Sequence, residues 1–427
     1  MTSLCDNTRA SGTLWRPFLC LLLLITGAQP SFPAGKFYTY VGSLSHNSAL
    51  LAWGTADGPG NTIGRDSASH GDAVVIVGGL RVEESNRNWV RLSGLTPDTS
   101  YPYEIQVKGT SIGKGQFRTW AEKASKLTFF VIGDFGRGDG NQYRLGQVMA
   151  EEFQKRSSTD NPVRFVLTTG DNLYGSSTML LRLRETGAND RDWRTRFFEP
   201  YETVLKSIPF YPTLGNHDGN ETENREDLTT YLDNFFFPED GKHRFYRFSY
   251  GGLAEFFALD STDNTSSGGG EPEYAEGGEQ DRWLKQAMSV PAEVPWRIAY
   301  FHHPPFNAGP RHPPSRDTLK HLIQSLERGK VRVVFNGHEH NFQTSEDNAG
   351  TGGIQYVLSG AGGELRAGSV VHDMKAAHIA AWAAQYHFLV VEIDGRTMSI
   401  TPRSFGDFRP VDPAGKPVRL PIEVKLR

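Results

Sequence analysis

Five short apolar runs in the second part of the chain are each followed by side chains that can bind a metal ion. The five blocks are Gly133-Asp134-Phe135-Gly136, Gly170-Asp171-Asn172-Leu173-Tyr174, Gly215-Asn216-His217-Asp218, His302-His303-Pro304-Pro305 and Gly337-His338-Glu339-His340. Each preceding run is short enough to be a buried strand, so each strand is expected to deliver its ligands at its carboxyl end. Carboxylate, amide, phenol and imidazole groups together suit transition metals. The order of these residues therefore predicts a metal site built on the loops of a sheet.

Two metal ions about 3.5–4 Å apart can acidify a water molecule and neutralise the oxygens of a phosphate ester. Such a pair needs one ligand that bridges the ions, and Asp171 in the second block is our candidate because a carboxylate can bridge. The remaining candidate ligands are Asp134, Tyr174, Asn216, His302, His338 and His340. Any single block is more often a turn, a helix cap or a chance pair of histidines. All the blocks in order, each after a strand, favour one shared site.

Two kinds of sequence pattern divide the chain, one before the blocks and one around them. Residues 36–120 contain short runs rich in β-branched and aromatic residues, separated by Gly, Asp, Asn and Pro, which predicts a small all-β sandwich. From about residue 122, apolar runs alternate with amphipathic stretches such as residues 144–156 and 316–328, which indicates an α/β domain. We therefore expect a β-sandwich domain over residues 35–121 and a domain that holds the site over residues 122–427.

The first 34 residues have the pattern of a targeting segment. Arg9 and Arg16 precede the apolar run of residues 18–25, and small residues such as Ala28 follow, which favours a cleaved signal peptide over residues 1–34. The run is too short to span a bilayer, which takes about 20 apolar residues, although a retained anchor is the alternative. Both cysteines, Cys5 and Cys20, lie in this segment, so the mature chain would hold no disulfide and no catalytic cysteine. The protein is therefore expected to be secreted, either extracellular or periplasmic.

The charges of the chain nearly balance. The net charge is −4, from 45 basic and 49 acidic side chains. This balance gives no reason to expect nucleic acid or an anionic membrane surface as a partner, so any anionic substrate would have to be bound by a local site. No run beyond the signal segment is apolar enough to span a membrane.

The five blocks resemble the signature motifs of the calcineurin-like metallophosphoesterases, and they extend from Asp134 to His340. Many members of that superfamily carry Asp-x-His in the first block, where this chain has Asp134-Phe135-Gly136. The second block instead ends in Tyr174, three residues after Asp171, and this pairing resembles the purple acid phosphatases, whose tyrosinate binds a ferric ion. The resemblance implies an α/β domain of two packed sheets flanked by helices. Residues 92–101 and 115–119 likewise resemble parts of fibronectin type III-like domains.

The resemblance also implies how the ligands are divided between the two ions. The ligands of Fe(III) would be Asp134, Tyr174 and His340. The ligands of the second ion, which is Fe(II), Zn(II) or Mn(II) in the family, would be Asn216, His302 and His338. Asp171 would bridge the two. Because a phenol ordinarily has a pKa near 10, a strong Lewis acid must hold Tyr174 as a phenolate.

Two histidines outside this ligand set are candidates for contact with the substrate. His217 matches the family's histidine that binds the substrate phosphate, where a donor stabilises negative charge in the transition state. His312 is the nearest candidate for a donor to the leaving group, because the chain lacks the histidine pair that plant-type members carry after the fourth block; a solvated loop histidine is the alternative. Two alternatives to the ligand set stay open. His303 could be the metal ligand in place of His302, and Tyr174 could be an aromatic residue of the core that binds no metal.

These observations together predict a secreted acid phosphatase that hydrolyses small phosphate monoesters with a metal-bound hydroxide. A phosphodiesterase or a phospholipase would use the same centre, and the loops that include residues 175–196 and 261–280 do not reveal which substrate fits. The rival from another class is an extracellular binding or adhesion protein whose β sandwich is the working part. Such a protein would be expected to lack metal ligands. None of the expected ligands is missing from this sequence, which favours the enzyme.

Overall fold

The computed structural model describes residues 35–56, 63–174, 176–177, 184–185, 190–220, 228–238, 243–263, 272 and 274–427. The predicted signal peptide and both cysteines lie outside these residues, as do parts of the loops 175–196 and 261–280. Within the described part, no helix is both long enough and apolar enough to cross a membrane. Residues Lys36–Arg427 pack as one unit.

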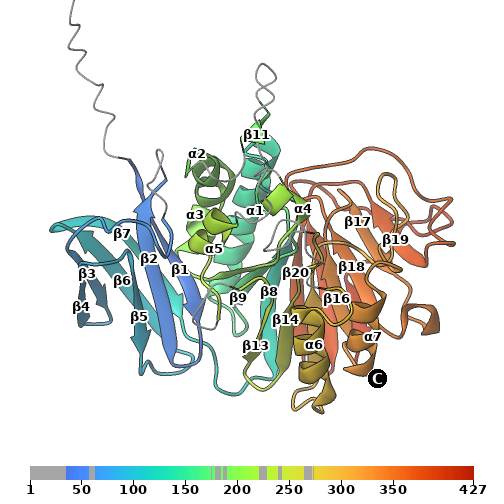
Figure 1. The fold of residues 1–427 in the computed structure, drawn as a ribbon, viewed down its shortest axis with the longest axis horizontal. Coiled ribbons are helices and arrows are strands. Elements are labelled where there is room, and N and C mark those ends of the chain that lie inside the picture. Colours follow the sequence, from blue (N-terminus) through green and yellow to red (C-terminus); the bar gives the residue numbers. More distant parts are fainter. Residues whose placement is uncertain are drawn as a thin grey trace, which may run out of the picture. The chain divides into compact units, whose positions relative to one another are not determined.

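Two antiparallel sheets form the first part of the chain, drawn in blue to teal in Figure 1. The three-stranded sheet has the order β1-β2-β5 and consists of β1 (Phe37–Leu44), β2 (Ser48–Thr55) and β5 (Trp89–Ser93). The four-stranded sheet has the order β4-β3-β6-β7 and consists of β3 (Ala73–Val77), β4 (Leu80–Glu84), β6 (Ser100–Val107) and β7 (Thr110–Arg118). The predicted all-β region is therefore present, and its likeness to fibronectin type III domains stays a prediction.

The strands β1 and β2 are buried on both faces. Seven of the eight residues in each strand are buried, whereas β3 alternates between buried and partly exposed residues. Side chains from the second part of the chain bury the outer face of this sheet. The Tyr38 ring lies 5.6 Å from that of Phe198, and the Tyr40 ring lies 5.9 Å from that of Phe236. The Tyr40 hydroxyl also donates to the carbonyl oxygen of Asn234 at 3.2 Å. One face of this sheet is thus covered by the α/β part.

Two mixed sheets form the rest of the chain. The six-stranded sheet, in the order β12-β9-β8-β20-β21-β22, consists of β8 (Lys126–Ile132), β9 (Val163–Thr168), β12 (Phe210–Pro212), β20 (Phe388–Asp394), β21 (Thr397–Arg403) and β22 (Ile422–Lys425). The seven-stranded sheet, in the order β13-β14-β15-β16-β18-β17-β19, consists of β13 (Tyr246–Tyr250), β14 (Ala254–Ala258), β15 (Trp296–Tyr300), β16 (Val333–Asn336), β17 (Phe342–Ser345), β18 (Gln355–Ser359) and β19 (Ile379–Ala383). A separate short pair consists of β10 (Ser176–Ser177) and β11 (Arg184–Glu185). Strands β8, β9 and β12 are mutually parallel, as are β14, β15, β16 and β18, so their carboxyl ends lie at one edge of each sheet.

Helices flank these two sheets (Figure 1). The longer helices are α1 (Gly140–Ser157), α3 (Glu199–Leu205), α6 (Glu279–Ser289) and α7 (Lys320–Arg328). The shorter ones are α2 (Asp190–Trp193), the π-helical η1 (Arg194–Phe198), α4 (Asn216–Asn220), α5 (Thr229–Asn234) and the 3-10 turn η2 (Ala349–Thr351). The helix α1 begins where the Asp139 carboxylate accepts the backbone N–H groups of Asn141 and Gln142, both at 3.0 Å. Leu284 of α6 and Leu326 of α7 pack in one core with residues of β14, β15 and β16.

The six-stranded and seven-stranded sheets pack face to face through aromatic rings. The ring of Phe129 in β8 lies 5.3 Å from that of Phe256 in β14 and 6.1 Å from that of Phe335 in β16. The ring of Phe165 in β9 lies 5.2 Å from Phe256, and all these side chains are fully buried. The structure therefore has the predicted fold, two packed sheets flanked by helices, preceded by an all-β region.

A buried histidine in this fold makes stability depend on pH. The His387 Nε2 lies 3.1 Å from the Ser359 hydroxyl, its Nδ1 lies 2.8 Å from the Gln385 carbonyl oxygen, and burial lowers the pKa of His387 to about 4. An unfolded histidine titrates near 6.5, so between about pH 6.5 and 4 the unfolded chain binds a proton that the folded chain does not. This contribution to stability is present above pH 6.5 and is lost as the pH falls through that window.

We expect the wild type to lose about 1.5 kcal/mol more free energy of unfolding than His387→Gln between pH 6.5 and 5.0, because glutamine keeps polar contacts but does not titrate. Urea denaturation of both proteins at the two pH values measures this difference. Parallel pH dependence of the two proteins would show that His387 is not the source.

Candidate metal centre

The structure has a strand directly before each of the five candidate blocks. In the six-stranded sheet, β8 ends at Ile132 before Asp134, β9 ends at Thr168 before Asp171, and β12 ends at Pro212 before Asn216. In the seven-stranded sheet, β15 ends at Tyr300 before His302, and β16 ends at Asn336 before His338. Because these strands are parallel within each sheet and the sheets share a core, the loops that follow them converge at one end of the sandwich.

Three donor atoms, from Asn216, His302 and His338, form the first set of the candidate centre, which corresponds to the proposed second ion. The Asn216 Oδ1 lies 3.0 Å from both His302 Nε2 and His338 Nδ1, and these two nitrogens are 3.1 Å apart. Ligands at right angles around one ion, with bonds of about 2.1 Å, are separated by about 3 Å. The His302 Nδ1 lies 2.8 Å from the carbonyl oxygen of Thr169, so a proton on Nδ1 leaves the Nε2 lone pair free for a metal.

A second set of donors lies around Tyr174. Its hydroxyl lies 3.3 Å from Asp134 Oδ1 and 3.2 Å from His340 Nε2, and these two atoms are 3.5 Å apart. The Asp171 carboxylate connects this set to the first, since its Oδ1 lies 3.5 Å from His302 Nε2. Ligand atoms of Asp134, Asp171 and His302 all lie within 4.8 Å of one another. Asp171 is thus placed between the two sets.

The electrostatics of these donors suit bound cations. Burial and then the Asp171 carboxylate raise the pKa of Asp134 well above its ordinary value, because two buried carboxylates repel each other. Burial, followed by both carboxylates, raises the pKa of Tyr174 well above 10. Burial lowers the pKa values of His302, His338 and His340, which keeps the imidazoles neutral with free lone pairs. Neutral imidazoles beside repelling carboxylates form a donor set that fits a metal pair.

The backbone at these loops is held in unusual conformations. Asp134, Asp171 and His338 have φ values of 55°, 50° and 72°, in the left-handed region that non-glycine residues rarely adopt. Such strain concentrates at functional sites, where the surrounding structure enforces it. Glycine at position 170 lets the backbone of this loop approach the His302 ring, because a Cβ there would lie 2.6 Å from His302 Nδ1.

Asp218 ties two of the loops together. Its carboxylate accepts the backbone N–H of Gly215 at 2.7 Å, and those of Asn172 at 3.0 Å and Leu173 at 3.2 Å. Burial and the neighbouring Asp171 raise the pKa of Asp218 to about 7. Asp218 was part of the third block but was not among the predicted ligands, and in the structure it supports the loops that present Asp171 and Asn216.

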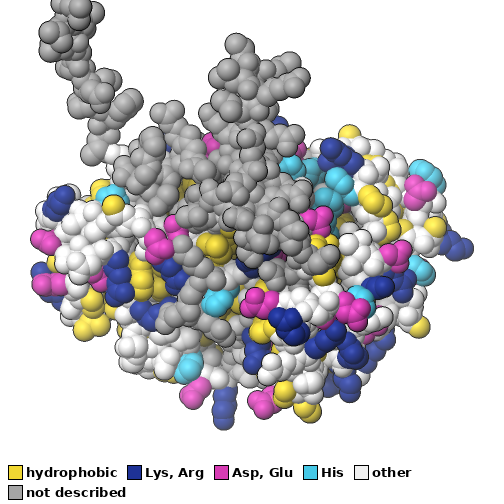
Figure 2. Space-filling model, viewed as in Figure 1, with side chains coloured by type: hydrophobic (Ala, Val, Ile, Leu, Met, Phe, Trp, Pro, Cys, Tyr) yellow, Lys and Arg dark blue, Asp and Glu magenta, His cyan; other side chains and the backbone are white. Residues whose placement is uncertain are grey.

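The two predicted substrate histidines also lie at this end. The His217 backbone N–H donates to Asp171 Oδ1 at 2.9 Å, and its ring lies 4.8 Å from that of Tyr174. The His312 ring lies 4.0 Å from that of His338, so His312 lies beside the candidate ligands. The partly exposed histidines here are His217, His303, His312 and His338. Figure 2 shows histidine side chains (cyan) gathered on this face.

His303 lies beside the first set of donors. Its Nδ1 is 3.1 Å from the Ser261 hydroxyl and its ring is 4.4 Å from that of His338. The group His302, His303 and His338 could itself hold a metal ion. The direct contact with the Asn216 amide oxygen is made by His302, which supports His302 as the ligand and leaves His303 as a neighbour at the rim.

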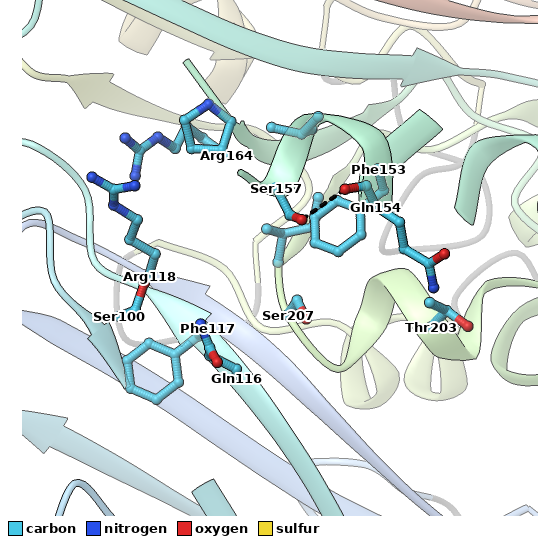
Figure 3. Close-up of a pocket in the computed structure, with 13 residues that line it drawn as sticks. Ser100, Gln116, Phe117, Arg118, Phe153, Gln154, Ser157, Arg164, Thr203 and Ser207 are labelled. Atoms are coloured by element: carbon cyan, nitrogen blue, oxygen red, sulfur yellow. Dashed lines mark hydrogen bonds between the residues drawn. The ribbon is translucent and has the colours of Figure 1, made fainter. Parts of the chain in front are cut away.

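A cavity of about 340 Å³ lies elsewhere, between the first part of the chain and the α/β part (Figure 3). It is lined by residues of β6, β7, α1, β9 and α3, including Phe117 and Phe153. Two arginines line one side: Arg118 and Arg164 donate to the two carboxylate oxygens of Asp98 at 2.9 and 2.8 Å. None of its lining residues is a candidate ligand, so the chemistry is assigned to the histidine-rich end.

The model of the calcineurin-like phosphoesterase family matches residues 127–342, about half of the chain, and the protein therefore belongs to that family. Within this family, the chain is similar to purple acid phosphatases. An uncharacterized protein of Mycobacterium tuberculosis is 24% identical over 346 residues, covering 75% of this chain and 63% of that protein. The tartrate-resistant acid phosphatase type 5 of Rattus norvegicus is 27% identical over 300 residues, covering 65% of this chain and 86% of that enzyme.

Two solved structures share the fold over most of the chain. A structure of PhoD aligns with a TM-score of 0.66 and 14% identity, covering 92% of this chain and 94% of that one. The purple acid phosphatase from yellow lupin (Lupinus luteus) seeds aligns with a TM-score of 0.65 and 14% identity, covering 91% of this chain and 74% of that one. These likenesses confirm the predicted metallophosphoesterase fold.

Proposed function

We propose that this protein hydrolyses phosphate monoesters as an acid phosphatase with a dinuclear centre. Support comes mainly from one observation: Asp171 lies between two sets of donors, each suited to one ion. The first ion, Fe(III), would be held by Asp134, Tyr174 and His340. The second, a divalent Fe, Zn or Mn ion, would be held by Asn216, His302 and His338. Two bound ions would supply an acidified water and neutralise charge on the phosphate.

The residues of the chain would orient these groups and the substrate. The Thr169 carbonyl oxygen fixes the tautomer of His302, and the His217 N–H fixes one oxygen of Asp171. The His217 imidazole would donate to the phosphate as negative charge develops. His312 would donate to the leaving oxygen; burial, Arg366 and Arg311 lower the pKa of His312 to about 4, so an N–H of the neutral ring is the donor above that pH.

The remaining expectations complete the proposal. The leader of residues 1–34 would direct the chain out of the cytoplasm, and the all-β region would be a fibronectin type III-like accessory domain. The substrate would be a small phosphate ester, with no nucleic acid as partner. The all-β region contacts the α/β part through rings such as those of Tyr38 and Phe198, which are not candidate ligands, and this suits an accessory role.

Metal analysis combined with two substrates tests the proposal. We expect close to two metal ions per chain, and turnover of p-nitrophenyl phosphate at least tenfold faster than that of bis(p-nitrophenyl) phosphate. Faster turnover of the diester would identify a phosphodiesterase with the same centre. A folded, metal-free protein that hydrolyses neither ester would instead point to the rival binding protein.

A further inference from the structure

A buried carboxylate lies between two of the candidate ligands and has no part in the proposed chemistry. Glu339 follows His338 and precedes His340, and its side chain is fully buried. Its Oε2 accepts the backbone N–H of His312 at 2.7 Å and that of Arg311 at 3.2 Å. A buried carboxylate is costly unless it is paired and hydrogen-bonded, so these contacts hold the loop against Glu339 strongly.

The other oxygen of Glu339 lies in an ion pair that lacks the geometry of a hydrogen bond. Its Oε1 lies 3.2 Å from Nε of Arg366, and Nη2 of the same guanidinium lies 3.1 Å from Nδ1 of His340. Arg366 thus connects the carboxylate back to a candidate ligand. Sequence reasoning missed both residues, because Arg366 stands outside every block and Glu339 is the middle residue of a motif defined by its histidines.

The loop that Glu339 holds carries His312. Within this loop, Asn307 donates from Nδ2 to the His312 carbonyl oxygen at 2.7 Å and accepts the Gly309 N–H at 2.8 Å. Asn341 donates to the Gly309 carbonyl oxygen at 3.0 Å. Residues 307–313 are therefore fixed at several points, and Glu339 from outside the loop binds the backbone of His312, whose ring lies 4.0 Å from that of His338.

We infer that Glu339 is a positioning residue that holds the loop 307–313 so that His312 faces the leaving group of the substrate. This inference rests on the proposed function. Glu339 would act through His312, and its removal would matter most when the leaving oxygen most needs a donor. An alcohol needs a donor more than an acidic phenol does, because the alkoxide is the poorer leaving group.

The test compares Glu339→Gln with the wild type on glycerol phosphate and on p-nitrophenyl phosphate. We expect kcat on glycerol phosphate to fall roughly tenfold, and kcat on the aryl ester to fall much less, with metal content unchanged. His312→Ala should show the same selectivity with a loss of roughly 100-fold on glycerol phosphate. The double variant should be no slower than His312→Ala, because Glu339 is expected to act only through the His312 side chain, which that variant lacks.

A matched control carries the same substitution on a neighbouring acidic residue. Glu364 pairs with Arg137 at 3.1 Å instead of with the loop, so Glu364→Gln should change the turnover of both substrates by the same factor. Equal losses on both substrates for Glu339→Gln, or losses that add fully to those of His312→Ala, would overturn the inference.

Amide hydrogen exchange gives a readout that needs no turnover. The N–H groups of Arg311 and His312 both donate to Glu339, so exchange in the peptide that contains residues 307–313 should become roughly tenfold faster in Glu339→Gln. If this variant loses its metals, Glu339→Asp is compared with metal-free wild type by the same measurement. Unchanged exchange in both variants would overturn the inference. If exchange is faster in the variant but the wild type hydrolyses no phosphate ester, the proposed function is refuted and the contact between Glu339 and the loop stands.

Discussion

Asp171→Asn is expected to lose both metal ions and at least roughly 10³-fold in kcat on p-nitrophenyl phosphate. Asparagine keeps the shape of the side chain and an oxygen that can accept the His217 N–H, which in the wild type donates to Asp171 Oδ1 at 2.9 Å. It removes the negative charge, and a neutral amide is a poor bridge between two cations. Metal analysis and steady-state kinetics measure the two losses. A variant that kept both metals and near-normal activity would show that the ligand assignment is wrong.

The same substitution should have the opposite effect on the metal-free protein. Asp134 and Asp171 are both buried, and the Asp171 carboxylate helps to raise the pKa of Asp134, so without cations the two carboxylates oppose folding. Metal-free Asp171→Asn should therefore melt at a higher temperature than metal-free wild type. As a control, Asp98→Asn weakens pairs with Arg118 and Arg164 and should lower the melting temperature with metal content unchanged. A lower melting temperature for metal-free Asp171→Asn would argue against a repelling carboxylate pair.

The strands and the candidate blocks that follow them could be predicted because the relevant signals are local. Each ligand block follows an apolar run, and residues such as Gly170 mark turns where a side chain would collide with His302. The layered fold followed from the alternation of strands and helices together with the family resemblance. The structure brings Tyr174 within 3.3 Å of Asp134 and His340, which the family resemblance implies as ligands of one ion, although 166 residues separate Tyr174 from His340.

The supporting contacts could not be predicted because they depend on how the two sheets pack. The position of His312 is set by Glu339, which lies 27 residues further along the chain and reaches the loop only after β16 has been placed. Arg366 approaches His340 from a segment that carries no motif. The burial of β1 and β2 on both faces likewise arises from rings such as Phe198 in the α/β part. Such long-range contacts leave no periodic signal in the sequence.

A colour change is expected from Tyr174→Phe. The Tyr174 side chain is buried, and burial with two nearby carboxylates raises its pKa well above 10, so a phenolate forms there only if a strong Lewis acid binds it. If that ion is Fe(III), charge transfer from the phenolate should colour the wild type purple or pink. Phenylalanine has nearly the same shape but no oxygen, so the fold should persist and the band should disappear.

The Tyr174→Phe variant should lose its absorption band completely but only part of its activity. The carboxylates, the amide and the imidazoles that remain could still hold two ions, so we expect a loss of roughly tenfold in kcat instead of abolition. Tyr201→Phe is the control, because Tyr201 is another buried tyrosine, its hydroxyl lies 3.5 Å from Nε2 of Gln142, and it is not a candidate ligand; the band of this variant should be unchanged. Visible absorption and iron content are measured on the same samples. A colourless, fully active wild type that contains only Zn(II) or Mn(II) would rule out Fe(III) at Tyr174, and the two-metal phosphatase would stand without it because Asp171 would still connect both sets of donors.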